Sequence, residues 1–258
     1  MSEELFSRNT LYWGEDKQKI LAQKHVAVFG LGGVGGFCAE ALARAGVGNL
    51  TIVDFDTVSE SNINRQIIAL QSTIGQKKTE LFAKRLKDIN PDINIKIFDD
   101  FYTENENLSL AIMWRGIKGE GQYDYVADAI DTMRSKIHLL KTCYENRVPV
   151  ISSMGAGNRI DPTKLYIADL KDVENRNATF VSNVIYQLKK LGITEGITFV
   201  CSRETPQVQE KITEKEEIIT NSGEKIEFNK IIPSSTPFVA SCSGIFMASY
   251  IVQRLFED

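Results

Sequence analysis

The feature that most constrains the fold of this chain is a glycine-rich run that directly follows a short apolar segment. Residues 25–35 read HVAVFGLGGVG, and the glycines at positions 30, 32 and 35 fit the pattern G-x-G-x-x-G. Between a strand and a helix, such glycines permit a tight turn, close approach of backbone to phosphate and close packing of helix on strand. The sequence therefore predicts a loop for nucleotide phosphates, made of Gly30, Gly32, Gly33, Val34 and Gly35.

Segments typical of strands and of helices alternate through the first 155 residues. Strands are expected at 25–29, 49–53, 93–98, 123–130 and 148–152, and helices at 33–45, 77–90, 104–114 and 133–146. Gly46 and Gly48 are expected to end the first of these helices, and Asn90-Pro91 the second. The alternation predicts an α/β class, with a Rossmann-like, doubly wound and mostly parallel sheet.

The flanking segments differ from this regular core. A helical arm is expected at residues 5–24, and after Ser153 the pattern becomes irregular. There we expect strands in RIDPTKLYIADL and ITFVCSRE, a helix in NATFVSNVIYQLKKLGI, a hairpin turning at 221–223 and a closing helix at 238–255. With no repeat or low-complexity linker, we expect one domain. Residues 1–155 form its nucleotide-binding core, and 156–258 a C-terminal elaboration with substrate loops.

Composition excludes several classes of protein. The net charge is −4, so no overall basic field attracts nucleic acid, and RNA binding would need a local patch. The cysteines are scattered and the N-terminus is polar, which argues against a disulfide framework and an export signal. The apolar stretch 238–255 contains serines and a glycine and is barely long enough to span a bilayer, which favours a core helix. We expect a cytoplasmic protein without a membrane span.

A carboxylate follows the second expected strand at the position where a ribose would be held. Asp54 lies 19 residues after Gly35. Together with the glycine loop it predicts a mononucleotide or dinucleotide site, although the glycines could also serve turns alone. This fingerprint does not separate NAD from ATP, because both contain adenosine and a phosphate pair.

The residues beyond Asp54 favour a triphosphate. ATP that is about to lose pyrophosphate needs cations near its β and γ phosphates, and the candidates are Asn62, Arg65, Gln66 and Lys78. Asp131 follows the fourth strand at the carboxyl edge of the sheet, where it could hold Mg²⁺. The plain alternatives are that Arg65 and Lys78 are surface charges and that Asp131 caps the next helix.

Four stretches taken together resemble the adenylating domain of the ubiquitin-activating-enzyme-like superfamily, which contains MoeB, ThiF and HesA. They are VAVFGLGGVGG, LTIVDFDTVSESNINRQ, IGQKKTE and DAIDTMRSK, and the resemblance covers roughly residues 5–155. It implies an enzyme that uses ATP and Mg²⁺ to convert a carboxylate into an acyl-adenylate, usually as a homodimer.

The resemblance also implies roles for individual residues. Asp54 would hold the ribose, Arg65 and Lys78 the phosphates, and Asp131 the metal. Asp56 would be a second carboxylate near the site. Arg8, on the N-terminal arm, is the candidate for an arginine that reaches into the site of the partner subunit.

Further stretches resemble one branch of the superfamily, the tRNA threonylcarbamoyladenosine dehydratases. They are TLYWGEDKQKIL, FDDFYTENENL, VPVISSMGAGNRIDPTKLYIADL and FVCSRETPQ. The chain has no C-x-x-C pair for a thiolate zinc site and no appended sulfur-transfer domain, which argues against the MoeB and ThiF subtypes. The implied partner is tRNA carrying threonylcarbamoyladenosine, whose adenylated carboxylate would cyclise. Such an intramolecular step needs no enzyme nucleophile.

Several alternatives remain open at this stage. The acceptor could be the C-terminus of a ubiquitin-like or sulfur-carrier protein, and the chain could instead be an NAD-dependent oxidoreductase or a nucleotide-binding regulatory module. Cys201 could be a nucleophile or a buried inert thiol, and Arg159 could contact substrate or be structural. Cys38, Cys143, His25 and His138 are expected to be structural. The candidates for an RNA-binding patch are Arg159, Lys164, Arg176, Lys189, Lys190 and Arg203.

Overall fold

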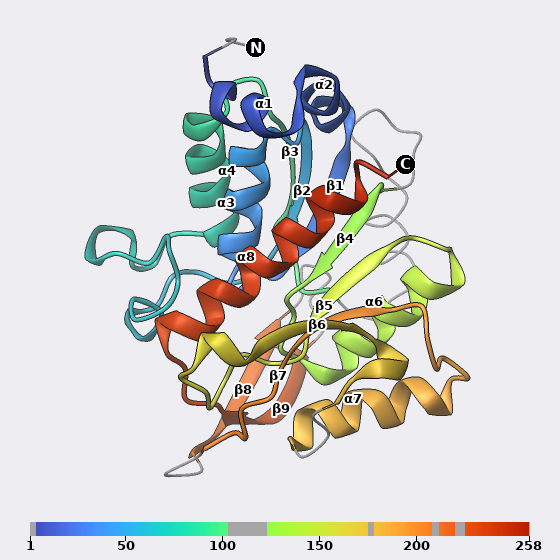
Figure 1. Cartoon of the computed structure of the whole chain (residues 1–258). Helices are drawn as coiled ribbons and strands as arrows, with labels where there is room; N and C mark the ends of the chain where they lie inside the picture. The colour runs from blue at the N-terminus through green and yellow to red at the C-terminus, as the bar shows by residue number, and fades with distance from the viewer. Residues whose placement is uncertain (1–3, 103–122, 175–177, 208–211, 220–224, 258) are drawn as a thin grey trace.

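A computed structural model describes residues 4–102, 123–174, 178–207, 212–219 and 225–257. Within these ranges a seven-stranded sheet forms the centre of the molecule, with helices on both faces (Figure 1). The strands are β1 (His25–Phe29), β2 (Asn49–Val53), β3 (Asn94–Phe98), β4 (Tyr125–Asp128), β5 (Val150–Ser153), β6 (Leu165–Asp169) and β7 (Thr198–Ser202). The helices are α1 (Ser7–Trp13), α2 (Glu15–Gln23), α3 (Gly35–Ala45), α4 (Lys78–Ile89), α6 (Met133–Glu145), α7 (Thr179–Lys190) and α8 (Pro237–Arg254).

The sheet is parallel apart from one edge strand. Its order is β3-β2-β1-β4-β5-β7-β6, and only β6 runs antiparallel to its neighbour. The order reverses between β1 and β4, which is the position where open α/β sheets bind ligands. The predicted α/β, Rossmann-like, doubly wound fold is confirmed. The sheet takes strands from both of the predicted parts, since β6 and β7 lie beyond residue 155.

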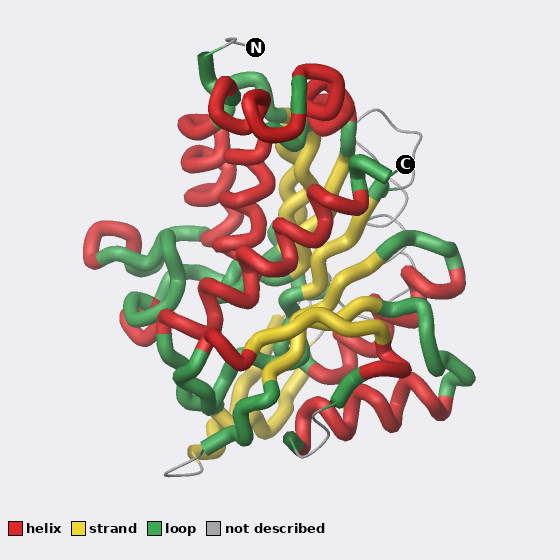
Figure 2. Tube along the Cα trace, viewed as in Figure 1, coloured by secondary structure: helices red, strands yellow, loops and turns green. Residues whose placement is uncertain are grey.

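Each face of the sheet packs against its own set of helices (Figure 2). Side chains alternate along a strand. In β1, Val26 and Val28 therefore face the core formed with α3, α4 and α8, while Ala27 and Phe29 face the core formed with α6 and α7. Because both faces are covered, the central strands are mostly apolar, and this is the reason that the sequence shows them as short apolar runs.

The predicted N-terminal arm is two helices. Gly14 separates α1 from α2 with a φ of 85°, a conformation that glycine adopts without steric cost. Both helices lie at the amino edge of the sheet, where the side chain of Gln18 donates from Nε2 to the Ala45 carbonyl at 3.0 Å. The predicted helical arm over 5–24 is therefore confirmed, and the structure adds a break at Gly14.

The C-terminal part completes the sheet and then crosses back over it. β8 (Ile212–Ile219) and β9 (Lys225–Ile232) pair as an antiparallel hairpin, as predicted. The predicted turn at 221–223 and the predicted helix at 104–114 lie outside the described residues. α8 crosses in front of the sheet and lies against α3 (Figure 1). A Cβ atom on Gly244 would come within 2.2 Å of the Val34 carbonyl oxygen, so this close approach requires glycine. Among the described helices, none combines the length and the hydropathy needed to cross a bilayer.

Candidate active site

A pocket of about 540 Å³ opens at the carboxyl edge of the sheet, where the strand order reverses. We distinguish three parts of its lining. The N-terminal wall is formed by Gly30, Gly32, Gly33, Asp54, Asp56, Asn62, Arg65, Gln66 and Lys78; the floor by Asp131, Thr132 and Ser135; the C-terminal wall by Ala156, Gly157, Pro233, Ser235 and Ala240. The N-terminal wall and the floor hold every charged residue named here.

The glycine loop needs its glycines for different reasons. Gly30 has a φ of 85°, and a Cβ atom there would lie 2.9 Å from the Ala129 carbonyl oxygen. A Cβ atom on Gly35 would lie 1.8 Å from the Gly30 carbonyl oxygen, so only glycine fits at the first turn of α3. Gly32 faces open space apart from the side chain of Gln66 at 3.7 Å. The loop is thus shaped by Gly30 and Gly35, while Gly32 leaves room for a ligand.

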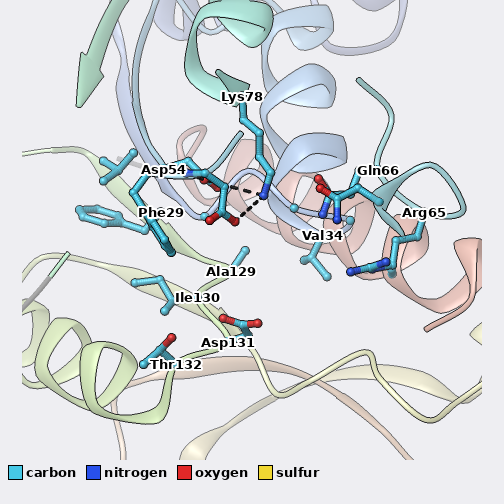
Figure 3. A pocket seen from close by; sticks show the side chains of 18 of the residues that line it. Phe29, Val34, Asp54, Arg65, Gln66, Lys78, Ala129, Ile130, Asp131 and Thr132 are labelled. Atoms are coloured by element: carbon cyan, nitrogen blue, oxygen red, sulfur yellow. Dashed lines mark hydrogen bonds and ion pairs between the residues drawn. The ribbon is translucent and has the colours of Figure 1, made fainter. Parts of the chain in front are cut away.

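Asp54 and Lys78 lie together at the base of the N-terminal wall (Figure 3). Asp54 directly follows β2, and its Oδ2 accepts a hydrogen bond of 2.6 Å from the Leu31 backbone N–H. Lys78 is the first residue of α4, and its Nζ lies 2.6 Å from Asp56 Oδ2 and 3.9 Å from Asp54 Oδ1. Burial raises the pKa of Asp54, and the charge of Lys78 offsets part of that rise. Lys78 is only 3% exposed, so the surface-charge alternative was wrong for this residue.

The segment after Asp56 contributes the other polar groups of this wall. Asn62 is buried, and its Oδ1 accepts a hydrogen bond from the Ser59 backbone N–H at 3.2 Å. Arg65 is half-buried; burial lowers the pKa of its guanidinium, and the charge of Asp131 raises it. Gln66 is buried, and among the described residues its Oε1 finds no hydrogen-bond partner. That oxygen can accept a hydrogen bond from a bound ligand.

Asp131 lies on a turn beyond the end of β4. The predicted strand 123–130 is shorter in the structure, because Asp128 Oδ1 accepts a hydrogen bond of 3.0 Å from the Ile130 N–H and so stabilises a turn. The exposed side chain of Asp131 lines the pocket (Figure 3). The N-cap position of α6 belongs to Thr132, so the alternative of Asp131 as the cap was wrong.

A buried charge pair supports this turn, and sequence reasoning missed it. Lys136 and Asp128 are both fully buried, with 2.6 Å between Nζ and Oδ2, and Ser152 Oγ donates to the same carboxylate oxygen at 2.7 Å. The available signal was that Lys136 shares one face of α6 with Leu139, Leu140 and Cys143. A charge on the apolar face of a helix requires a buried partner.

The C-terminal wall is built from backbone hydrogen bonds around Arg159. Its guanidinium donates to the carbonyl oxygens of Gly155, Gly157 and Glu204 at 2.6, 3.0 and 3.2 Å, and the residue is 6% exposed. Of the two roles considered for Arg159, this geometry supports the structural one. Sequence patterns missed Pro233, Ser235 and Ala240, because no residue type there carries a recognisable chemistry.

Other candidates lie away from the pocket. Arg8 is exposed on α1, which lies beside the amino edge of the sheet, and it does not line the pocket of its own chain. Cys201 is buried in β7, and burial raises the pKa of its thiol to about 12, which favours the inert interpretation. Burial also raises the pKa of the Cys38 and Cys143 thiols. All four cysteines are free.

The two histidines make structural contacts. The Nε2 atom of His25 lies 2.9 Å from the Thr51 hydroxyl, and the Nδ1 atom of His138 lies 3.1 Å from the Tyr102 hydroxyl. Burial lowers the pKa of His25 to about 4, so its ring is neutral at physiological pH. Neither histidine lines the pocket.

The candidates for a basic patch do not all reach the surface. Lys164, Lys189, Lys190 and Arg203 are exposed, whereas Arg159 is buried and Arg176 lies outside the described residues. Arg203 pairs with both carboxylate oxygens of Glu174 at 2.8 and 2.9 Å, so part of its charge is already neutralised.

Comparison with known proteins defines the class to which this fold and site belong. A model of the ThiF family matches residues 6–249, and the chain belongs to this family. It is 42% identical over 253 residues to tRNA threonylcarbamoyladenosine dehydratase of Bacillus subtilis (strain 168), a match that covers 98% of this chain and 95% of that protein. The enzyme of the same name in Escherichia coli (strain K12) is 39% identical over 64% of this chain and 59% of its own length.

Solved structures agree with the sequence comparison. The E. coli tRNA N6-threonylcarbamoyladenosine dehydratase TcdA in complex with ATP superposes with a TM-score of 0.82 and 28% identity, over 99% of this chain and 95% of that one. The resemblance to the adenylating superfamily, and to its dehydratase branch, is confirmed.

Proposed function

We propose that this chain is an ATP-dependent tRNA threonylcarbamoyladenosine dehydratase. It adenylates the threonyl carboxylate of the modified nucleoside, promotes its cyclisation, and releases AMP and pyrophosphate. The observation that carries the proposal is the convergence of Asp54, Arg65, Lys78 and Asp131 on one pocket at the reversal of strand order. Similarity to the B. subtilis enzyme along nearly the whole chain supports the choice of substrate.

The pocket residues divide the work of adenylation. The N–H groups of the glycine loop and the start of α3 face the phosphates, and Asp54 accepts hydrogen bonds from the ribose. Lys78 and Arg65 supply positive charge as pyrophosphate leaves. To reach a phosphate, the ammonium of Lys78 has to exchange its ion pair with Asp56 for a phosphate oxygen.

Attack by the substrate carboxylate on the α-phosphorus breaks the bond to pyrophosphate. A nucleophilic atom of the same modification then attacks the activated carbonyl, loses its proton and expels AMP. One water is formally lost, and its oxygen leaves with AMP. A nucleophile held in the same molecule has a high effective concentration, so no enzyme thiol is needed.

The donor set suits Mg²⁺, provided that ATP contributes oxygens. Among the described residues no three His, Cys, Asp or Glu side chains form a cluster that could hold a metal alone. Protein-bound Mg²⁺ is commonly held by one or two carboxylates and substrate phosphates, and Asp131 offers such a carboxylate in the pocket. When bound, the ion would neutralise phosphate charge.

We further propose that the chain acts in the cytoplasm as a homodimer and forms a single adenylating domain over 1–258. Arg8 lies outside the pocket of its own chain, which is compatible with a role in the site of the partner subunit. The exposed lysines at 164, 189 and 190 are candidates for contacts to tRNA phosphates.

The test is to incubate the protein with ATP and tRNA that carries threonylcarbamoyladenosine. Unmodified tRNA and buffer serve as controls. We expect ATP–pyrophosphate exchange and AMP release only with the modified tRNA, and a nucleoside lighter by one water in mass spectrometry. If ATP binds but the modified tRNA triggers neither reaction, the proposal fails. The next acceptor to test in the same exchange assay is then the C-terminus of a ubiquitin-like or sulfur-carrier protein.

A further inference from the structure

Asn64 connects the two walls of the pocket, although it was not among the predicted site residues. Its Oδ1 accepts a hydrogen bond of 2.9 Å from Arg65 Nη1, and its Nδ2 donates one of 2.8 Å to the Ser235 carbonyl oxygen. Ser235 lies 171 residues further along the chain. One amide group thus joins a charged residue of the N-terminal wall to the backbone of the C-terminal wall.

On the N-terminal side, Asn64 helps to orient the guanidinium of Arg65. The same Nη1 atom also donates to the Ser61 carbonyl oxygen at 2.8 Å. A Cβ atom on Gly33 would lie 3.2 Å from both Cγ and the carbonyl oxygen of Arg65, so this arginine also packs against the glycine loop. The position of the Arg65 side chain is therefore determined by its hydrogen bonds to Ser61 and Asn64 and by its packing against Gly33.

On the C-terminal side, Ser235 belongs to the segment 233–236, which is hydrogen-bonded to the loop that follows β5. Asn158 Oδ1 accepts hydrogen bonds from the N–H and the hydroxyl of Ser234, at 2.8 and 3.0 Å. The Asn158 N–H donates to the Ser234 carbonyl at 2.7 Å, and the Gln207 N–H donates to the Asn158 carbonyl at 2.8 Å. The Thr236 hydroxyl donates to the Arg159 carbonyl at 3.1 Å. These hydrogen bonds join residues 155–159 and 233–236 into one unit, so we expect a displacement of Ser235 to move both segments.

We propose that Asn64 is a positioning residue that transmits the position of Arg65 to this unit. In this way a bound triphosphate sets the placement of the wall that receives the acceptor. The inference rests on the proposed function, in which Arg65 holds phosphate. Because the acceptor binds to this wall, the linkage lets bound ATP strengthen the binding of the acceptor.

A purely structural role would give a different result on substitution. The two hydrogen bonds of Asn64 lie at the surface, where one bond contributes little to stability because water replaces it. Removing the amide should therefore leave the fold intact, and the consequence should appear in the response of the C-terminal wall to ATP.

The test compares Asn64→Ala with the wild-type chain by amide hydrogen exchange, with and without saturating ATP. The reporters are the amides of Asn158, which belongs to the unit, and of Gln207, which donates to the Asn158 carbonyl; neither residue lines the pocket. In the wild type we expect ATP to slow their exchange by about threefold or more, and in Asn64→Ala we expect no slowing. With modified tRNA at saturating ATP, we expect Asn64→Ala to raise KM for tRNA by about fivefold.

Asn49→Ala is the matched control. The amide of Asn49 also accepts from a side chain, Asn94 Nδ2 at 3.1 Å, and donates to a backbone carbonyl, that of Gln23 at 3.2 Å. It lies at the amino edge of the sheet, away from the pocket, and this variant should retain the wild-type response to ATP. Equal slowing in Asn64→Ala and wild type, or no slowing in the wild type, overturns the inference. Absence of turnover by the wild type overturns the proposed function, while the exchange data still decide the linkage.

Discussion

The two walls of the pocket achieve their shapes by opposite means. The N-terminal wall carries charged side chains that follow directly on β2 or begin α4, as Asp54 and Lys78 do. The C-terminal wall carries small uncharged residues, and its shape depends on hydrogen bonds between backbone segments around Asn158 and Arg159. The comparison teaches that charged side chains define one wall, whereas the placement of the backbone defines the other. Substitutions in the N-terminal wall should therefore reduce ATP–pyrophosphate exchange, whereas those in the C-terminal wall should lower stability and raise KM for tRNA.

The largest expected effect belongs to Lys78→Ala in the N-terminal wall. In the proposed function Lys78 supplies positive charge to the phosphates, so its loss should reduce ATP–pyrophosphate exchange by about 100- to 1,000-fold, with the fold retained. Lys77→Ala is the matched control, because Lys77 pairs with Asp99 in a more exposed position. Its activity should stay within about twofold of wild type, since exposed pairs contribute little. Normal exchange in Lys78→Ala would show that this wall does not hold the phosphates.

Mixing two inactive variants tests whether the N-terminal wall is completed by a second subunit. Arg8→Ala and Arg65→Ala should each lose about 100-fold in activity, and subunit exchange between them should restore roughly a quarter of the wild-type activity, because half of the dimers would hold one intact site. Arg65→Ala mixed with itself is the control. Verified mixed dimers without recovered activity would confine the role of Arg8 to its own chain.

Arg159→Ala should reveal the different character of the C-terminal wall. The substitution leaves carbonyl groups around residues 155–157 without their donor, and we expect a loss of about 3 kcal/mol in the free energy of unfolding. ATP affinity should change little, while KM for modified tRNA should rise several-fold. Arg159→Lys should recover part of both losses. Weaker ATP binding with an unchanged KM for tRNA would erase the distinction between the walls.

His25 provides a test of the scaffold that involves neither wall. Burial lowers its pKa from 6.5 to about 4, so the folded protein binds fewer protons than the unfolded chain in this range. The contribution of His25 to the free energy of unfolding is fully present above pH 6.5 and is lost as the pH falls toward 4. After a discount for partial exposure, it amounts to about 1–2 kcal/mol. In urea titrations between pH 7 and 4, the free energy of unfolding should decline less steeply in His25→Gln than in wild type. Equal declines in the two proteins would show that His25 is not the source of the pH dependence.

The smallest expected effect belongs to Cys201→Ala. Because burial in β7 keeps the thiol protonated and it does not line the pocket, AMP release should stay within about twofold of wild type. Cys143→Ala, which removes another buried thiol, on α6, is the control for loss of packing. A selective loss of activity in Cys201→Ala would instead assign a thioester step to the C-terminal part.

The sequence predicted the parts of the molecule that depend on local patterns. The bounds of β1 and β2 agree with the expectation, because apolar runs between turn residues define buried parallel strands. Asp54 and Lys78 were recognisable because charged residues at the carboxyl edge of such a sheet have few structural uses. The placement of Asp131 beyond β4 depended on the side chain of Asp128, which strand periodicity does not reveal.

The parts of the site that the sequence did not predict depend on contacts between residues that are far apart in the chain. Arg159 gave no indication in the sequence whether it faces substrate or backbone, since the answer depends on carbonyl groups as far away as that of Glu204. Ser235 and Ala240 reach the pocket because α8 folds back across the sheet and approaches the glycine loop at Gly244. No short-range sequence pattern identifies such contacts.

The return of α8 to the glycine loop has a consequence for biosynthesis. A nascent chain that has emerged as far as Lys78 already contains the residues of the charged wall, yet the opposite side of the pocket includes Ser235 and Ala240. The ribosome must therefore translate past residue 240 before the two sides can meet. Products of premature termination before Ser235 therefore contain the charged wall but lack the opposite side of the pocket.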